Sequence, residues 1–235
     1  MTRLQAELNR LYLAPSASLV DAQGHVRALV LELTGPADWA ALSRAWQGVQ
    51  GELELPAPAI AVSGVDGLQL WFSLEQPVPA ARAHAFLDAL RLRFLPDVAV
   101  RRVLLMPAPD AAAPSRSLHA ALVPALQEPT GNWSAFVAPD LAAVFSEQPW
   151  LDVEPGEEGQ ANLLRGVQST KTEAFEAAWR RLLATAPTSA DATHRAPDSA
   201  QAGDDPRRFL LRVMNDESVA LALRIEAAKA LLARD

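Results

Sequence analysis

Polar side chains that could form a binding site gather on two predicted strands, 27–34 and 68–74. In each strand apolar residues alternate with polar ones, so one face packs inward and the other carries the polar groups. The outward set consists of Glu32 and Thr34 from the first strand and of Gln69, Trp71 and Ser73 from the second. Glu32 is its only carboxylate, and one carboxylate cannot hold the pair of metal ions that two-metal phosphoryl transfer uses.

A glycine turn, Ser63-Gly64-Val65-Asp66-Gly67, precedes the second of these strands. Glycine permits positive φ in a tight hairpin, and Asp66-Gly67 is a common turn dipeptide. Three interpretations of Ser63, Gly64 and Gly67 stay open: a purely structural turn, a contact to a nucleotide or nucleic acid, or a contact to another protein.

The elements that would position these residues follow the order βαββαβ. Apolar periodicity and Gly/Pro breaks predict them over residues 27–34, 38–50, 59–63, 68–74, 80–94 and 100–106. This is the order of a ferredoxin-like or RRM-like core within residues 26–106, which makes the chain an α+β protein. Such a sheet carries both helices on one face, and we expect the other face to be open.

Further elements surround this core. We expect an amphipathic helix over 2–12, a loop over 107–118 and a helix over 170–184. Residues 119–165 are predicted to cover part of the sheet and to include a short helix at 139–145.

The chain is expected to divide into three parts. Residues 1–185 would form the main domain. Residues 186–204 lack apolar periodicity and are predicted to be a disordered linker. Residues 205–235 are predicted to form a helical hairpin, which is too small to bury a core alone and would need a partner or self-association.

Composition excludes several classes of protein. The 235 residues are 50% hydrophobic and contain no cysteine, which excludes disulfides, thiolate metal sites and cysteine nucleophiles. No apolar run is long enough for a membrane helix and residues 1–13 do not resemble a signal peptide, so we expect a cytoplasmic protein without membrane contact. Residues 1–165 carry 11 Lys and Arg against 18 Asp and Glu, a net charge of −7, which does not support nucleic-acid binding. No cofactor is expected.

The segment from Ser63 to Gln69 resembles the Ser-Gly-x-x-Gly-x-His motif of archaeo-eukaryotic primases and the related ligase-associated polymerases. The resemblance extends over residues 26–106 in element order. It implies a split-βαβ core, glycines that approach nucleotide phosphates, a nucleotide contact from the position of Gln69, and metal-binding acids on the first strand.

The positions that would perform the chemistry differ from this family. Its acidic pair becomes Glu32 and Thr34, its histidine becomes Gln69, and the predicted strand 100–106 contains no acid. The sequence therefore favours a degenerate primase-like domain without catalytic residues, and no metal site is predicted.

Two other kinds of site are not favoured. Trp71 could stack a base as in RNA-recognition modules, but no second aromatic stands on the first strand, which favours a covered core residue. A Ser/His pair within 116–119 could approach the sheet, although such a pair is common by chance. No metal motif fits the spacing of the four histidines, His25, His84, His119 and His194.

The C-terminal segment is similar to part of small-terminase-type phage proteins. The similarity rests on Asp205-Pro206-x-x-Phe209-Leu210-Leu211-x-Val213-Met214-Asn215-Asp216 and on Leu223-Arg224-Ile225-Glu226-Ala227-Ala228-Lys229-Ala230-Leu231-Leu232. It implies a detachable interaction element, without the helix-turn-helix that usually accompanies it. The alternative is a converged amphipathic hairpin.

Two functions follow from these observations. The first is a catalytically inactive primase-like protein with an accessory role in nucleic-acid metabolism of a phage or mobile element. The second is a protein-interaction adaptor with a ferredoxin-like scaffold and no nucleotide binding. A basic open groove over the polar face would favour the first function, and an apolar cover over the same face would favour the second.

Overall fold

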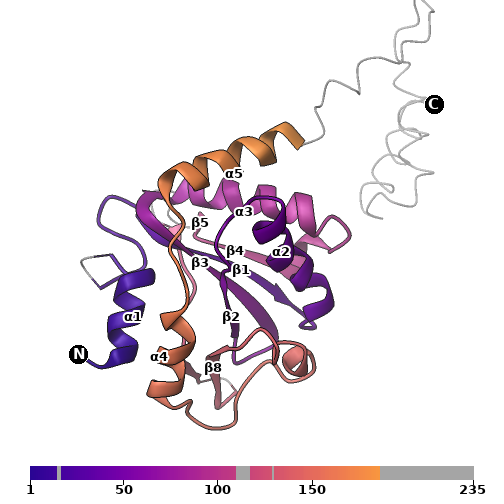
Figure 1. The fold of residues 1–235 in the computed structure, drawn as a ribbon. Coiled ribbons are helices and arrows are strands. Elements are labelled where there is room, and N and C mark those ends of the chain that lie inside the picture. Colours follow the sequence, from indigo (N-terminus) through magenta and orange to yellow (C-terminus); the bar gives the residue numbers. More distant parts are fainter. Residues whose placement is uncertain (15–16, 110–116, 129, 186–235) are drawn as a thin grey trace, which may run out of the picture. The chain divides into compact units, whose positions relative to one another are not determined.

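The computed structural model describes residues 1–14, 17–109, 117–128 and 130–185. Within these residues the chain is a mixed α+β protein with five α-helices and an antiparallel sheet (Figure 1), which confirms the predicted class. The predicted linker (186–204) and the predicted helical hairpin (205–235) lie outside the described residues.

Six antiparallel strands form the main sheet, in the order β4-β1-β3-β2-β8-β7. Their bounds are β1 His25–Thr34, β2 Ala59–Val62, β3 Gly67–Pro79, β4 Val103–Met106, β7 Ala125–Gln127 and β8 Asn132–Val137. β1 and β3 pair along most of their length, and their register places Glu32 opposite Gln69. The sheet therefore brings together the two polar residues that the sequence had placed on one face.

Helices α2 (Trp39–Gly51), α3 (Ala80–Phe94) and α5 (Thr172–Thr185) cover one face of the sheet (Figure 1). Asp38 begins α2, where its carboxylate accepts a hydrogen bond from the Ala41 amide at 2.9 Å. The alternating leucines of β1 and β3 face these helices as predicted and form the larger hydrophobic core. Phe175 joins α5 to this core, with its ring centre 4.6 Å from that of Phe86 in α3.

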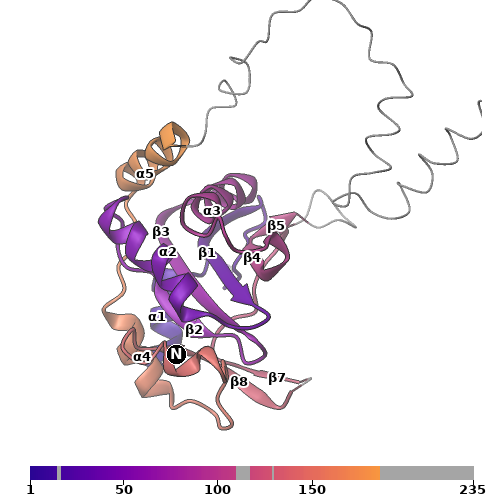
Figure 2. The same ribbon diagram turned by 90° about the vertical axis from the view of Figure 1, so that its right-hand side faces the viewer.

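Helices α1 (Arg3–Leu11) and α4 (Glu157–Arg165) cover the opposite face and lie side by side in both views (Figures 1 and 2). Arg10 of α1 joins the two helices, since its guanidinium donates to the carbonyl oxygens of Leu164 at 3.0 Å and Val167 at 3.1 Å. The expectation of an open second face is therefore wrong, because the N-terminal helix and α4 bury it under a second apolar cluster.

The side chain of Gln160 in α4 takes the place of a neighbouring strand beside β8. Its amide oxygen accepts from the Phe136 N–H at 2.7 Å, and its amide nitrogen donates to the Phe136 carbonyl oxygen at 3.0 Å. Both backbone groups lie beyond the last residue that pairs with β7. A buried backbone pair without partners is costly, so Gln160 stabilises the end of the sheet and the position of α4.

Two predicted strands differ from the observed ones. β3 continues to Pro79 although proline was expected to end it, because Pro77 lies in the irregular stretch 74–77, which faces Arg27 alone and interrupts the ladder, so that its missing N–H is not needed there. The first part of the predicted strand 100–106 is the 3-10 turn η1 (Val100–Arg102), so β4 begins only at Val103.

The prediction is least accurate between the core and α5. The helix expected at 139–145 is absent; turns and the 3-10 helix η2 (Val144–Ser146) occupy this segment, which is too short for a stable isolated helix. The loop expected over 107–118 contains a small strand pair, β5 (Ala108–Pro109) with β6 (Ser117–Leu118). Strands β7 and β8 and helix α4 were not predicted as such, although residues 119–165 cover part of the sheet as expected.

No helix among the described residues combines the length and hydrophobicity needed to cross a lipid bilayer.

The contacts of Gln160 give a first prediction. Gln160→Leu keeps the volume of the side chain but leaves both backbone groups of Phe136 without partners, so the free energy of unfolding should fall by about 2 kcal/mol. Urea denaturation followed by circular dichroism measures this change. Asn162→Ala, at an exposed position of the same helix, is the control and should leave stability unchanged; equal effects of the two substitutions would contradict the assigned role.

Candidate functional site

A hydrogen-bonded chain of three side chains crosses β3 and β1 at the predicted site. The Trp71 indole N–H donates to the Gln69 amide oxygen at 2.7 Å, and the Gln69 amide nitrogen donates to a Glu32 carboxylate oxygen at 3.0 Å. Trp71 and Gln69 are two residues apart on one strand and so share a face, while Glu32 faces Gln69 across the strand pair. The structure thus joins three of the predicted site residues directly.

The tryptophan end of this chain is closed to solvent. Trp71 has 0% exposure, as its prediction as a covered core residue requires. Its ring centre lies 5.2 Å from that of Tyr12, at the end of α1, and 5.9 Å from that of Phe136 in β8. Trp71 therefore cannot stack a nucleobase unless α1 and β8 move away.

The glycine turn packs against the β7–β8 hairpin. Gly64 has φ of +81°, and a Cβ there would lie 2.6 Å from the Gln127 side chain and 2.8 Å from the Ser134 amide nitrogen. Its N–H donates to the Pro149 carbonyl oxygen at 3.0 Å, and its carbonyl oxygen accepts from the Thr130 hydroxyl at 3.1 Å. The Gly64 N–H, the group that a phosphate-binding turn would present to its ligand, is therefore already bonded to Pro149.

Gly67 has a different reason to be glycine. Its φ angle is not positive, so turn geometry does not require glycine here. A Cβ at this position would clash with the Glu32 carboxylate. Ser63 closes the turn, since its hydroxyl oxygen accepts from the Gly67 N–H at 2.9 Å and from the Val65 N–H at 3.2 Å. Ser63, Gly67 and Glu32 thus lie together.

The side chains of the remaining predicted residues, Thr34 and Ser73, take no part in the hydrogen bonds described for this group. Thr34 pairs with Gly67 at the end of β1, and its carbonyl oxygen accepts from Arg102 at 3.1 Å. Ser73 is buried on the other side of Trp71, where its hydroxyl donates to the Leu11 carbonyl oxygen at 2.7 Å. Neither residue lines the cavity that borders Glu32.

A cavity of about 260 Å³ borders the Glu32 end of the chain. The residues that line it come from β1, the glycine turn, β3, β4, the segment 119–123 and the β7–β8 hairpin: Glu32, Ser63, Val65, Gln69, Met106, His119, Ala120, Ala121, Val123, Gln127 and Ser134. Only Glu32, Ser63 and Gln69 of these were predicted as site residues. The segment from His119 onward has no periodicity that places it in space, although 116–119 was noted as able to approach the sheet.

The pKa values of the two titratable groups of the cavity, Glu32 and His119, are shifted in opposite directions. Burial raises the pKa of Glu32 and the nearby Asp66 carboxylate adds to this, while the hydrogen bonds from Gln69 and Ser63 act in the other direction. Burial lowers the pKa of His119. The His119 Nδ1 accepts from the Ala120 N–H at 2.9 Å, which leaves Nε2 to donate to the Ala28 carbonyl oxygen at 3.0 Å. His119 is therefore a neutral, fully bonded structural residue and not a general base.

The site has no metal-binding constellation. Within the described part of the chain, no three His, Asp or Glu side chains come together as cation ligands. The residue opposite Glu32 on β4 is Leu104, so the neighbouring strand adds no carboxylate. The arrangement can bind a ligand through Glu32, but it lacks the groups for two-metal phosphoryl transfer.

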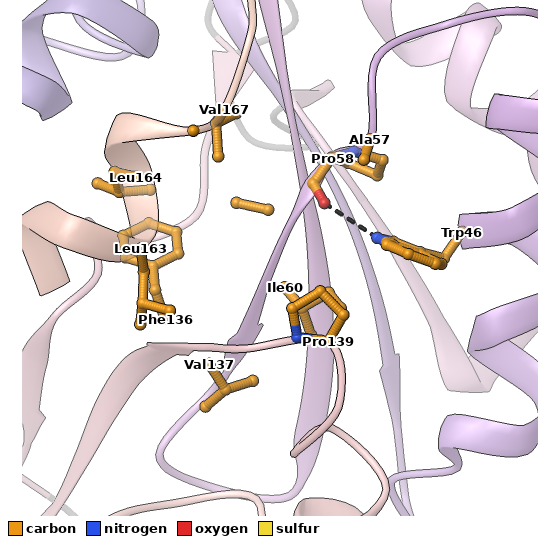
Figure 3. Close-up of a pocket in the computed structure, with 12 residues that line it drawn as sticks. Trp46, Ala57, Pro58, Ile60, Phe136, Val137, Pro139, Leu163, Leu164 and Val167 are labelled. Atoms are coloured by element: carbon orange, nitrogen blue, oxygen red, sulfur yellow. Dashed lines mark hydrogen bonds between the residues drawn. The ribbon is translucent and has the colours of Figure 1, made fainter. Parts of the chain in front are cut away.

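A second cavity, of about 130 Å³, is lined by apolar side chains that include residues of α2, β2, β8 and α4 (Figure 3). Trp46 of α2 borders it, with its indole N–H donating to the Pro58 carbonyl oxygen at 3.1 Å. Leu163 and Val167 border it from the end of α4. None of its lining side chains is titratable or nucleophilic, so it offers no catalytic chemistry.

The structure of the chain is similar to that of one phage protein domain described below. No family model matches the sequence, and no curated protein matches it. The chain is similar to the AEP domain of the primase-polymerase (PrimPol) of cyanophage S-2L, with 17% sequence identity and a TM-score of 0.29. The similarity covers 60% of this chain and 61% of that chain.

The Glu32 carboxyl gives a second prediction. Because its pKa is higher in the folded protein than in the unfolded chain, the folded state binds the proton more tightly. The free energy of unfolding should therefore fall as the pH rises from the ordinary carboxyl range through the raised pKa. Glu32→Gln removes this loss, so the variant should be more stable than the wild type at neutral pH, and the difference should shrink in acid.

Urea denaturation at several pH values, between about 4 and 8, measures the effect. The groups that face Glu32 are Gln69, Ser63, His119 and, as a charge, Asp66. Glu128→Gln at an exposed position is the control, and it should not change the slope of stability against pH. A variant Glu32→Gln that is less stable than the wild type at neutral pH would contradict the assignment.

Proposed function

We propose that this chain is a non-catalytic, primase-like accessory protein of nucleic-acid metabolism in a phage or mobile element, which acts in the cytoplasm through protein contacts. The order β4-β1-β3-β2, with α2 and α3 as crossovers on one face, supports a ferredoxin-like core to which β8 and β7 are added. The glycine turn Ser63–Gly67 stands between β2 and β3, where the resemblance to primases puts it.

One observation carries this proposal. Glu32, the position that matches a metal-binding acid of primases, is engaged by Gln69, which is itself engaged by the buried Trp71. Side chains that would contact metal and nucleotide in a polymerase are here hydrogen-bonded to one another. A single carboxylate in this arrangement supports loss of nucleotidyl transfer.

The adaptor alternative gains support from the cover over the sheet. Helices α1 and α4 bury the face that would receive a nucleic acid, and the Gly64 N–H is bonded to Pro149. We therefore favour a form of the accessory function in which this face binds no nucleotide.

Primer synthesis tests the proposal. The full chain should form no product from a single-stranded template and nucleoside triphosphates with Mg²⁺ or Mn²⁺, under conditions in which an active primase does. Product that is abolished by Glu32→Ala would overturn the proposal.

Direct nucleotide binding separates the two forms of the proposal. Isothermal titration with dATP, with and without Mg²⁺, should give no heat of binding. Binding that is lost in Gln69→Ala would restore a nucleotide contact at this site and would remove the adaptor form.

We also propose that residues 205–235 bind a protein partner or a second copy of the chain, as their similarity to small-terminase-type proteins suggests. Removal of this segment should abolish self-association or partner binding and leave the unfolding midpoint of residues 1–185 unchanged. Light scattering coupled to gel filtration measures the mass. An assembly of the same mass without residues 205–235 would contradict this role.

A further inference from the structure

Among the described residues, no Arg, Lys or His side chain forms an ion pair with the Glu32 carboxylate. Its hydrogen-bond partners are the neutral side chains of Gln69 and Ser63. A partly buried charge without an opposite charge is unfavourable unless something else compensates for its lost hydration.

The structure does not need a charge at this position. Gln69 requires only an acceptor from residue 32, and a neutral amide oxygen could accept the same bond. Because burial raises the pKa of Glu32, the carboxylate is expected to lower stability at neutral pH relative to such an amide, yet the chain contains it. Residues that lower stability in this way are typical of binding sites, where the charge meets a ligand.

The other polar groups of the cavity show which ligand would fit. The Gln127 amide nitrogen donates one N–H to the Ala125 carbonyl oxygen, which leaves the second N–H and the carbonyl oxygen of the same amide for a ligand. The Ser134 hydroxyl both accepts from and donates to the backbone of Ala125. A ligand would therefore meet the carboxylate of Glu32 and the neutral amide of Gln127, and the carboxylate is the charged group of the two.

The charge of the cavity points the same way. Within the described part of the chain, no Arg or Lys lines the cavity, and Asp66 adds a second negative charge near Glu32. Phosphates and carboxylates would be repelled here. Met106, Val123 and Val65 give the cavity an apolar wall that can contact a short hydrocarbon chain.

We propose that the Glu32 cavity binds a compact organic cation, a primary ammonium or guanidinium group on a short apolar chain, through a charge-assisted hydrogen bond to Glu32. A volume of about 260 Å³ is below the range of drug-sized pockets and fits a small amine. This binding goes beyond the proposed accessory function. The bound cation can be a free amine or the basic side chain of a peptide, and the experiment distinguishes these two sources.

Titration by NMR of the full chain tests the proposal with n-butylamine and agmatine as probes, and with n-butanol and butyrate as neutral and anionic controls. The amines should shift the backbone amide signals of Gly67 and Ala120, which adjoin Glu32 and His119, with a dissociation constant on the order of 1 mM. The controls should shift neither signal. A peptide with a central arginine should bind as well as agmatine only if the cavity takes side chains as well as free amines.

Two variants make the result specific. Glu32→Gln should weaken amine binding at least tenfold although it stabilises the fold, whereas the surface control Glu128→Gln should bind as the wild type does. Ala121→Trp places a bulky ring at an exposed position on the cavity rim and should also block the amines without disturbing the core.

The outcomes are decisive in both directions. Equal shifts with butanol or butyrate, or amine binding that survives Glu32→Gln, would overturn the proposal, as would no shift with any amine. Failure here leaves the non-catalytic function intact, because that function depends on the primer-synthesis result. Primer synthesis by the chain, in turn, would not alter the binding measured with amines.

Discussion

The burial of the Trp71 indole is the constraint on which the rest of the site depends. An indole N–H inside a core needs an acceptor, and Gln69 provides it from the same face of β3. The amide of Gln69 then needs an acceptor for its own N–H, and Glu32, directly opposite across the strand pair, supplies one. One buried aromatic ring therefore fixes the orientation of two polar side chains and leaves the carboxylate at the border of a cavity.

This constraint bears on the proposed loss of polymerase chemistry. The strand order and the glycine turn are properties of the backbone, and they persist when side chains change. At the positions that the resemblance to primases assigns to metal and nucleotide, Glu32 and Gln69 are hydrogen-bonded to each other in a sheet that has helices on both faces. Once α1 and α4 cover the second face, the buried polar groups of Gln69 and Trp71 must be bonded internally, and Glu32 is left at the border of the cavity.

The sequence predicted the parts of the fold that depend on local patterns. Leu29, Leu31 and Leu33 alternate clearly, and the strand they predict is β1; Asp38 indicates the start of α2, where its side chain caps the helix. The cover of the second face could not be predicted, because it depends on long-range contacts such as Arg10 with the end of α4. No local pattern states which distant helix will pack against an amphipathic segment.

The same limit applies to the candidate site. Glu32 and Gln69 could be paired from strand alternation alone, since register follows from the apolar pattern. His119, Gln127 and Ser134 could not, because they lie in segments without periodicity and reach the site through the tertiary fold. Turn geometry is one of three interpretations that the sequence leaves open for Gly67, and the structure adds another reason for glycine there, because the Glu32 carboxylate occupies the space that a Cβ would need.

The amide of Gln160 has a consequence for how the protein behaves in a crowded solution. A free strand edge with unpaired backbone groups is a template on which another chain can add a strand and begin an aggregate. The outer edge of β8 is occupied first by β7, and then, where β7 has ended, by the side chain of Gln160. The side chain of Gln160 thus occupies the backbone groups of β8 that the short β7 does not reach. A strand of another chain cannot pair with these groups while Gln160 is bonded to them.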